Sequence, residues 1–442
     1  MRAVEREVLK KVTPSAAEDR KVFSAVEALV PMVMEAAAAL DAHIEPKLVG
    51  SVAKGTHLRN MDIDLFMLVP ESTSVQQLRD VGLEIGRKVL GGEEHYAQHP
   101  YVRGTFNGFQ VDLVPCFHVR DLRKKMSAVD RTPFHTEFVK AHLKRGQHDQ
   151  VRLLKRFMKG IGYYGAEAKV QGFSGYLCEL LVIRFGTFEE VLRDASGWTE
   201  GAAFGLPDHP GREFPEPLTF VDPVDSERNV ASAVSTDALR RFILASRAYL
   251  AGPDAKFFFP AKPKKWLKAR IAKAAGDRLE NMTVVSFERL DLIDDVLYPQ
   301  LRKSLTSMTA LLERSDFEVV GTAMSVEDEV TLLIELSSIR LPRERVHRGP
   351  FVGSPNEVEF RAKWDNAGLS EPYKDGGRWY VVAERKQVRA DALLNEMISS
   401  LTLGKDVKKI KSFVVESGDQ LLARRHAGVM THYLDETPPW ER

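Results

Sequence analysis

The sequence contains very little cysteine and no long apolar run. Only Cys116 and Cys178 are present among 442 residues, and both lie within apolar stretches. Two such residues cannot build a disulfide framework, so small buried hydrophobic side chains are the simplest interpretation. No stretch approaches the roughly 18 apolar residues of a membrane span, and the first residues, which include Glu5 and Glu7, lack the apolar core of a signal peptide. The sequence therefore predicts a cytoplasmic protein in a reducing compartment, with no membrane partner.

The chain also lacks an excess of either charge. It holds 63 Lys and Arg against 62 Asp and Glu, a net charge of +1, so its overall charge does not indicate a nucleic-acid partner. Basic side chains gather only locally, within 261–278 and again at Arg340, Arg343, Arg345 and Arg348. A solvated face is the simpler interpretation of each cluster, and contact with nucleic-acid phosphates is the alternative.

Length and composition indicate a globular chain of several domains. A hydrophobic content of 44% and a charged content of 28% are ordinary, and 442 residues suffice for two to four domains. There are no internal repeats or low-complexity tracts. We predict an α+β multidomain chain with a head at 1–142, a mainly helical central domain at 143–260 and an α+β region at 261–442.

The head is predicted to hold a small mixed sheet with helices. Ser15 and Glu18 have the spacing of a capping box, which predicts a long helix to about residue 40 with a kink at Pro31. A strand-turn-strand unit is expected at 43–70 and a helix at 74–90. Asn107-Gly108 between two apolar segments is a strong signal for a β-hairpin.

Apolar residues recur at helical spacing in the centre of the chain. In the last part, segments with helical spacing alternate with segments typical of strands. Helices are predicted at 148–161, at 175–186 after a cap at Ser174, at 237–250 and, as a basic helix, at 261–278. The stretch 196–222 is rich in Gly and Pro and predicts an irregular connector. Further strands and helices are predicted at 283–287, 292–312, 317–323, 330–336, 356–367 and 379–383.

The order of these last elements is β-α-β-β-α-β over about 282–385. This is the split βαβ, or ferredoxin-like, pattern that RNA-recognition modules share. The segment has no RNP1-type string, so stacking of bases on its sheet is not predicted.

The most informative segment runs from Gly50 to Phe66. Asp62 and Asp64 are two positions apart, so in an extended strand they point to the same face, while Ile63 and its neighbours point into a core. Gly50-Ser51 ends an apolar run and opens a short turn or helix. The backbone N–H groups and the hydroxyl of such a turn suit a triphosphate.

A third carboxylate, Asp112, lies on the second strand of the predicted hairpin. If that strand pairs beside the strand of Asp62 and Asp64, three carboxylates converge. Like charges at such distances raise each other's pKa, and two Mg²⁺ ions, which favour oxygen ligands, relieve the repulsion. A lone Asp-x-Asp is more often a solvated strand edge. Gly50 and Gly55 have the spacing of a phosphate-binding Walker loop, but Thr56 stands where that loop needs Lys.

Taken together, the Gly50-Ser51 turn, Asp62-x-Asp64 and Asp112 resemble the catalytic core of polymerase β-type nucleotidyltransferases. Three further segments, 130–136, 151–177 and 222–229, are similar to the archaeal, class I CCA-adding enzymes. The resemblance covers nearly the whole chain and is least distinct in the C-terminal region. The family often has Trp where His57 stands here. The resemblance implies that the protein rebuilds the 3′-terminal CCA of tRNA from CTP and ATP, without a nucleic-acid template, by a Mg²⁺-dependent transfer that releases pyrophosphate.

The same resemblance implies roles for individual residues. It gives catalysis and metal binding to Asp62, Asp64 and Asp112. It gives binding of CTP or ATP to Ser51, Lys54, Thr132, His135, Lys155, Tyr164 and Arg228. It puts Tyr96 and Ala97 against the tRNA 3′ end, and it makes Lys264, Lys265 and Lys268 candidates for contact with the tRNA backbone. A homodimer is expected by analogy alone.

Each of these roles has a structural alternative. His135 would cap a helix, Tyr164 would pack in a core, Lys155 would be a solvated helix residue, and Arg228 would hold its own loop through a nearby acid. For the whole chain, the alternatives are a poly(A)-type polymerase that uses ATP repeatedly, a small-molecule nucleotidyltransferase and a catalytically inactive RNA-binding protein.

Overall fold

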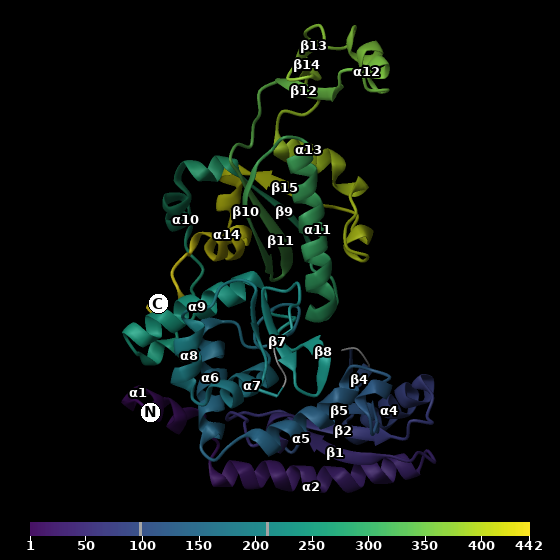
Figure 1. Ribbon diagram of the computed structural model, residues 1–442, viewed down its shortest axis with the longest axis vertical. Coiled ribbons are helices and arrows are strands. Elements are labelled where there is room, and N and C mark those ends of the chain that lie inside the picture. The colour runs from purple at the N-terminus through teal and green to yellow at the C-terminus, as the bar shows by residue number, and fades with distance from the viewer. Residues whose placement is uncertain (97–99, 209–211) are drawn as a thin grey trace. The chain divides into compact units, whose positions relative to one another are not determined.

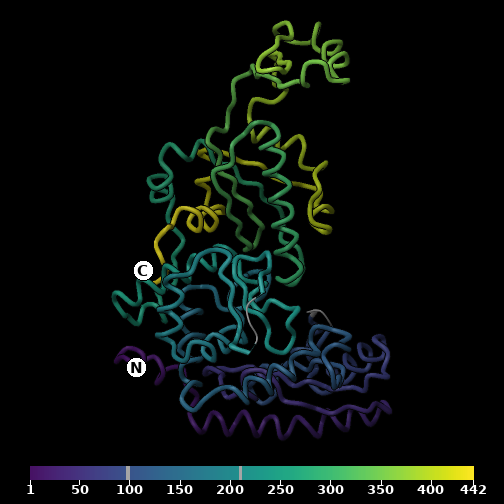
Figure 2. The backbone as a smooth tube through the Cα atoms, viewed as in Figure 1, coloured from purple at the N-terminus to yellow at the C-terminus, as the bar shows by residue number. Residues whose placement is uncertain are grey.

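The computed structural model describes residues 1–96, 100–208 and 212–442. The chain divides into two compact units (Figures 1 and 2): unit 1 holds Met1–Pro263 with Thr437–Arg442, and unit 2 holds Lys264–Glu436. The C-terminal tail belongs to unit 1, where Trp440 stacks on Phe257 with 5.2 Å between ring centroids. None of the helices in the described ranges is long and apolar enough to cross a membrane.

Unit 1 contains the mixed sheet that the sequence predicts. Its strand order is β1-β2-β5-β4-β3, in which β2 and β5 run parallel and the other neighbours run antiparallel. The strands are β1 (Glu45–Val49), β2 (Ile63–Val69), β3 (Glu93–Tyr96), β4 (Pro100–Phe106) and β5 (Phe109–Phe117).

Alternation along β2 and β5 separates the two faces of this sheet. Ile63, Leu65, Val111 and Leu113 are buried in one cluster with residues of α2 (Ala16–Ala38) and α4 (Val75–Leu90). These two helices therefore cover one face. The residues that alternate with these positions point to the opposite face, where Phe66, Leu68, Val114 and Cys116 form a second buried cluster. Asp64 and Asp112, at one end of this face, offer polar groups for a site.

Two local sequence signals in the head are confirmed. The Ser15 side chain accepts the backbone N–H of Glu18, and the Glu18 side chain accepts that of Ser15, which is the predicted capping box. Pro31 lies inside α2, and the helix continues to Ala38. Asn107 and Gly108 both have positive φ, 48° and 83°, as a tight two-residue hairpin turn requires, and they join β4 to β5.

The helical part of unit 1 packs around one large apolar core. Phe157 lies at its centre, with ring contacts to Phe188, Phe242, Tyr249 and Phe258. The helices are α1 (Ala3–Val12), α5 (Thr132–His142), α6 (Gln147–Ile161), α7 (Gly175–Phe185), α8 (Phe188–Ala195) and α9 (Thr236–Ala251). Ser174 accepts the N–H of Leu177, so the predicted cap of α7 is confirmed.

The prediction of an irregular connector at 196–222 is wrong in part. This stretch contains β6 (Ala202–Phe204) and β7 (Leu218–Asp222), which form a three-stranded sheet with β8 (Asp225–Asn229) in the order β6-β7-β8. Every residue of β7 is buried. A short strand buried on both faces has no polar alternation to reveal it, and the surrounding Gly and Pro residues concealed it further.

The predicted basic helix is shorter than expected. Helix α10 spans Lys268–Ala275, so Lys264 and Lys265 precede it. Pro263 disfavours a helical conformation at Lys262, which precedes it, so a helix could not run unbroken from residue 261. The segment is held instead by Trp266, whose backbone N–H donates to the Thr431 hydroxyl at 2.8 Å in α14 (Ala427–Leu434).

Unit 2 contains a four-stranded antiparallel sheet in the order β10-β11-β9-β15. Its strands are β9 (Met282–Glu288), β10 (Val319–Val326), β11 (Glu329–Leu336) and β15 (Val414–Ser417), with the helices α11 (Asp294–Arg314) and α13 (Ala390–Met397). In chain order the strands lie 2-3-1-4 across the sheet, which is the ferredoxin-like arrangement.

The last two elements predicted for this arrangement are present, but their place in it is wrong. The strand expected at 379–383 is observed as β14 (Arg378–Glu384), and it belongs to a separate sheet. The helix expected at 356–367 is observed as α12 (Glu357–Trp364), and it lies between two strands of that sheet in the chain. That sheet has the order β12-β14-β13, with β12 (Glu344–Phe351) and β13 (Tyr373–Asp375). This sheet is an insertion between β11 and α13. The pattern of apolar residues in the sequence shows that a segment is a strand, but it does not show to which sheet the strand belongs.

Candidate active site

Three charged side chains lie in a row across the sheet of unit 1. Asp64 on β2 is the register partner of Asp112 on β5, and Asp112 is the register partner of Arg103 on β4. Directly opposed residues of neighbouring strands point to the same face. Asp62 stands one residue before β2 and is exposed. Strand β5 thus pairs beside β2, which is the arrangement that the convergence of the carboxylates required.

The Gly50-Ser51 turn lies directly against one of these carboxylates. Gly50 begins the short helix α3 (Gly50–Ala53) with φ of 69°, and a Cβ atom there would be 1.9 Å from Oδ2 of Asp64. Only glycine fits both the backbone conformation and the space. Ser51 follows it, so the turn predicted to hold phosphates and the acidic strand share one small region.

The carboxylates of the site are unfavourably placed as free anions. The pKa of Asp64 is raised to about 7, first by burial and then by the negative charges of Asp112 and Asp62, against the opposing effects of Lys54 and Arg103. The pKa of Asp62 is also raised: its side chain is exposed at the surface, but the surrounding protein still removes part of its hydration, and this outweighs the charge of Arg103. A cation among these oxygens would relieve both effects.

Asp112 is paired with arginine. Its two oxygens accept from Nε and Nη2 of Arg103, each at 2.6 Å. In the described ranges, no group of three or more His, Cys, Asp or Glu side chains is gathered closely enough to form a ready-made metal site. The oxygen ligands that Mg²⁺ favours are present on adjacent strands, but one of them is held by a guanidinium.

A second group of charges surrounds Glu179, which the sequence reasoning missed. The carboxylate accepts from Lys54 Nζ at 2.6 Å, from Lys155 Nζ at 2.9 Å and from the Thr56 hydroxyl at 2.5 Å. Glu179 is fully buried, which by itself raises its pKa, but the charges of Lys155 and Lys54 outweigh burial and lower the pKa to about 2. The group joins the end of α3 to α6 and α7.

A third group forms around Asp222, at the end of β7. Its Oδ2 contacts His135 Nε2 at 2.9 Å and Arg228 Nη1 at 2.8 Å, and its Oδ1 accepts from the Tyr176 hydroxyl at 3.2 Å. His135 stacks on Tyr176 with 4.0 Å between ring centroids. Lys54 Nζ lies 5.8 Å from the centroid of Tyr176, so this ring links the Asp222 group to the Glu179 group.

The remaining residues that the sequence singled out have varied surroundings. The Tyr164 hydroxyl and Lys155 Nζ both lie beside Gly175, at 3.0 and 3.5 Å from the position of a Cβ atom there. Thr132 is the first residue of α5, the helix that carries His135. Tyr96 is the last residue of β3 and pairs with Pro100, and Ala97 lies outside the described residues.

Three domain families match successive parts of the chain. The nucleotidyltransferase domain matches 39–135, the second domain of tRNA nucleotidyltransferase matches 149–259, and the C-terminal domain of the CCA-adding enzyme matches 278–418. The CCA-adding enzyme of Methanosarcina acetivorans is 41% identical over 91% of this chain and 90% of its own length. That of Thermoplasma volcanium is 41% identical over 92% and 91%, and that of Archaeoglobus fulgidus is 38% identical over 86% and 87%.

The chain belongs to the archaeal CCA-adding enzymes. It is a tRNA nucleotidyltransferase, as the resemblance of its motifs implied. Because the similarity extends through the CCA-specific C-terminal domain, the poly(A)-polymerase alternative has no support.

The residues that sequence reasoning missed in this CCA-adding enzyme left only weak signals. Glu179 stands inside the apolar run from Leu177 to Ile183, and a carboxylate in such a run needs a buried cationic partner. Tyr176 lies within the segment 151–177 already singled out, but no role was given to it. Arg103 carried no signal, because nothing in the sequence states which residue lies opposite Asp112.

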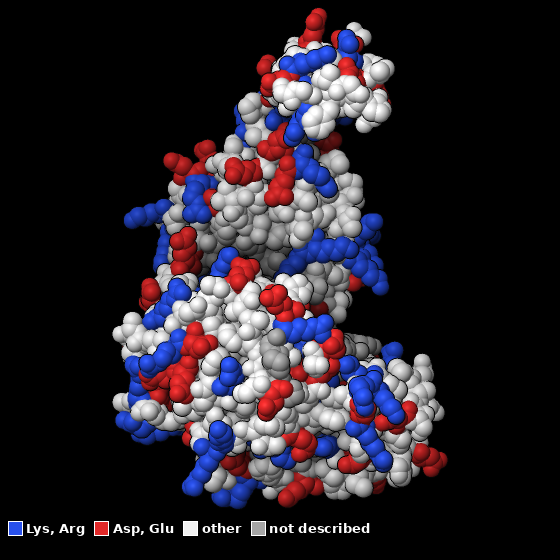
Figure 3. Space-filling model, viewed as in Figure 1, with Lys and Arg blue, Asp and Glu red and all other residues white. Residues whose placement is uncertain are grey.

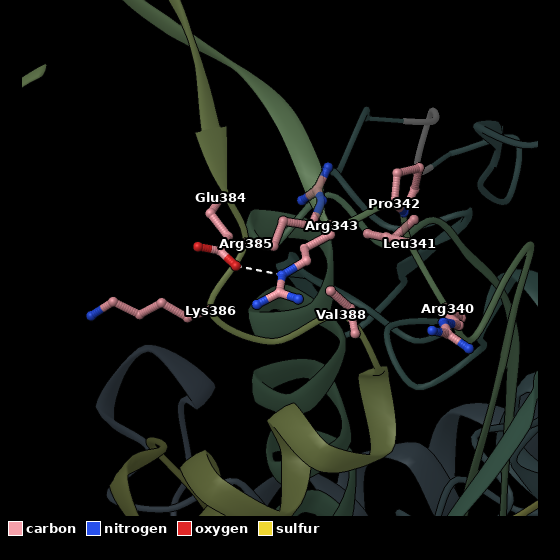
Figure 4. Close-up of a pocket in the computed structure, with 8 residues that line it drawn as sticks. All are labelled: Arg340, Leu341, Pro342, Arg343, Glu384, Arg385, Lys386 and Val388. Atoms are coloured by element: carbon pink, nitrogen blue, oxygen red, sulfur yellow. Dashed lines mark hydrogen bonds and ion pairs between the residues drawn. The ribbon is translucent and has the colours of Figure 1, made fainter. Parts of the chain in front are cut away.

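Unit 2 presents two basic surfaces. Lys264, Lys265 and Lys268 are exposed, and Lys265 pairs with Glu327 at 2.5 Å. The second surface is a pocket of about 590 Å³ where the chain enters and leaves the inserted sheet, and Figure 4 shows its lining residues: Arg340, Leu341, Pro342, Arg343, Glu384, Arg385, Lys386 and Val388. Figure 3 shows acidic and basic side chains interspersed over most of the visible face.

We expect Glu179→Gln to destabilise unit 1 at neutral pH, because two buried ammonium groups lose their counter-charge, at a cost of about 3–5 kcal/mol. Because the pKa of Glu179 is lowered from 4.5 to about 2, its ionised form stabilises the folded wild type by roughly 3 kcal/mol. This stabilisation is complete above pH 4.5 and is lost as the pH falls toward about 2. Melting temperatures measured between pH 7 and pH 3 should therefore fall less steeply in Glu179→Gln than in the wild type.

Glu7→Gln is the matched control, since Glu7 pairs with Lys10 on an exposed helix face. It should leave the melting temperature nearly unchanged. Equal pH dependence in the wild type and in Glu179→Gln would contradict the role of the buried ion pairs.

Proposed function

We propose that this CCA-adding enzyme adds C, C and A to the 3′ end of tRNA from CTP and ATP, without a nucleic-acid template and with release of pyrophosphate. The observation that carries the proposal is the in-register pair of Asp64 and Asp112 beside the Gly50-Ser51 turn, with Asp62 next to it. Carboxylates and a phosphate-sized turn in one small region fit a phosphoryl-group transfer better than any reaction of uncharged groups.

The residues present fit a pair of Mg²⁺ ions. All three candidate ligands offer carboxylate oxygens. The pKa of Asp64 is raised first by burial and then by the charges of Asp112 and Asp62, and a nearby cation would offset both effects. Asp62, Asp64 and Asp112 would hold the ions. When bound, such ions supply activation of the 3′-hydroxyl and neutralisation of the phosphate charge. The protein itself orients the two substrates and excludes competing geometries.

The groups around Glu179 and Asp222 would form the nucleotide site. Ser51 and Lys54 would meet the triphosphate, while Thr132, His135 and Tyr164 would surround the phosphates and sugar. Lys155 already contacts Glu179, the Thr56 hydroxyl and the Thr56 carbonyl, and its side chain is 2% exposed. An ammonium has three donors, so Lys155 would act through its charge and through its hold on Glu179 rather than by a hydrogen bond to phosphate.

Arg228 would read the base of the incoming nucleotide. Its bond to Asp222 uses one of the five N–H donors of a guanidinium, and its side chain is 31% exposed. Donors in a planar fork suit O2 and N3 of cytosine or N1 of adenine. The buried Asp222, shared with His135, would keep the fork in one orientation.

The tRNA would be held through its backbone phosphates and its 3′ end. Lys264, Lys265 and Lys268 are exposed enough for contact with phosphates. The pocket of unit 2 adds Arg340 and Lys386, together with Arg343 and Arg385, which pair with Glu384 and Asp316. Figure 4 shows Arg343 joined to Glu384 and Lys386 extending away from them. Tyr96 and Ala97 would lie against the 3′ end.

One assay tests the function directly. A tRNA lacking its last three nucleotides is supplied with each nucleoside triphosphate and Mg²⁺, and the product ends are sequenced. We expect two C residues and one A, in that order, and Asp62→Asn or Asp64→Asn should abolish all three additions while tRNA binding persists, because the lost group is a metal ligand. Asp80→Asn, an exposed residue of α4, is the control. Turnover by either site variant would rule the carboxylates out.

Neutralising the basic surfaces tests the contacts with tRNA. The triple variant of Lys264, Lys265 and Lys268 to Ala should weaken tRNA binding and reduce the slope of log affinity against log salt by up to about 3 units, because fewer counterions are released. The triple variant of Arg340, Arg343 and Lys386 to Ala should act likewise. Filter binding at several salt concentrations measures both slopes. A slope equal to that of the wild type would mean that the surface faces only solvent.

Arg228→Ala separates a base reader from an arginine that only holds its loop. We expect kcat/KM to fall about 5- to 150-fold, as the loss of roughly 1–3 kcal/mol implies, and discrimination among nucleotides to weaken. The melting temperature should stay within a few degrees, because His135 and Tyr176 still hold Asp222. Arg228→Lys should recover little activity, since lysine lacks the fork.

Arg212→Ala is the matched control, because Arg212 pairs with Glu227 on the exposed surface of the same region. It should change neither activity nor stability appreciably. A large fall in melting temperature for Arg228→Ala, with unchanged choice of nucleotide, would give Arg228 a purely structural role.

A further inference from the structure

Arg103 lies at the edge of the candidate metal site and forms hydrogen bonds to both oxygens of one carboxylate. It is the cross-strand partner of Asp112, and its Nε and Nη2 donate to the two oxygens in a bidentate pair, each at 2.6 Å. A bidentate guanidinium–carboxylate pair is among the stronger hydrogen-bonded contacts in proteins. Both oxygens that would bind a metal ion are therefore occupied by a cation that belongs to the chain.

The two members of this pair differ in exposure. The side chain of Asp112 is 11% exposed and that of Arg103 is 39% exposed, so the guanidinium lies on the open side of the pair. Asp112 is fixed on a central strand between β2 and β4, whereas the arginine side chain is long and flexible. If the pair opens, Arg103 is the partner with room to move.

A divalent ion and the guanidinium cannot both take the oxygens of Asp112. Two cations beside one carboxylate repel each other, and a ligand to a metal ion must give up at least one oxygen that now accepts from Arg103. This agrees with the lack of a ready-made group of three ligands among the residues that the structure describes.

We propose that Arg103 is a positioning residue that holds Asp112 in place until a divalent metal ion displaces its guanidinium, so that arginine and metal compete for the third carboxylate. The inference rests on the function proposed above, since it takes Asp112 as a metal ligand. Arg103 holds Asp112 in place when no metal is bound, and it lowers the apparent affinity of the site for metal by the free energy of its own pair.

The test is binding of Mn²⁺ to the full chain at one fixed pH, without nucleotide, followed by electron paramagnetic resonance. Arg103→Met, which keeps the length of the side chain and removes the charge, should bind Mn²⁺ about 5- to 30-fold more tightly, as expected if a pair worth about 1–2 kcal/mol no longer competes. In EDTA its melting temperature should fall below that of the wild type, and Mn²⁺ should recover the difference.

A second variant and two controls keep the outcome clear. Arg103→Lys retains the charge without the fork, so its affinity should lie between those of the wild type and Arg103→Met, and it serves if the Met variant does not fold. Arg123→Met removes an exposed bidentate pair with Asp121 and should leave Mn²⁺ affinity unchanged. Asp64→Asn identifies the fraction of Mn²⁺ that binds at this site.

Two results are distinguishable. If Arg103→Met and Arg103→Lys bind Mn²⁺ no more tightly than the wild type, and Mn²⁺ does not recover the lost stability, the competition is overturned and Arg103 is a structural brace. If the wild type and Asp64→Asn bind Mn²⁺ equally, the proposed metal site itself fails, and this inference fails with it.

Discussion

The site depends above all on the ion pairs of Glu179 with Lys54 and Lys155. One fully buried carboxylate binds two ammonium groups and the hydroxyl of Thr56, and so fastens the end of α3 to α6 and α7. Any member left alone would be an uncompensated buried charge, at a cost of several kcal/mol. The helices therefore cannot shift relative to the phosphate-sized turn without breaking all of these contacts together.

From this anchor, the geometry extends to the other groups. Lys54 lies over Tyr176, Tyr176 donates to Asp222, and Asp222 holds both His135 and Arg228. On the other side, the charge of Lys54 lowers the pKa of Asp64, which lies against Gly50. The candidate carboxylates and the proposed base reader are thus linked through Lys54, by its charge toward Asp64 and by ring and hydrogen-bond contacts toward Arg228. Among groups linked in this way, the loss of one member is expected to affect its neighbours, so the effects of single substitutions should not add.

Unit 2 illustrates how a familiar topology accommodates an insertion. The ferredoxin-like sheet closes with a strand of four residues, β15, only after the chain has built a second sheet at 344–384. The two connecting segments run side by side, with hydrogen bonds from Leu341 N to Val388 O and from Arg385 N to Arg343 O (Figure 2). Because the insertion leaves and returns at one place, the basic residues of both connectors gather in the pocket of Figure 4.

Sequence alone determined most elements of this protein and its family. The apolar strand Ile63–Val69, the positive-φ turn at Asn107-Gly108 and the cap at Ser15 depend on interactions between neighbouring residues, so they can be read from the sequence. Pairings between distant segments cannot be read in this way. Arg103 opposite Asp112, Glu179 between two lysines, and β15 in place of β14 beside β9 each bring together residues whose separation in sequence carries no signal. Only the tertiary structure decided them, because only packing fixes which strand lies beside which and which buried charge meets its partner.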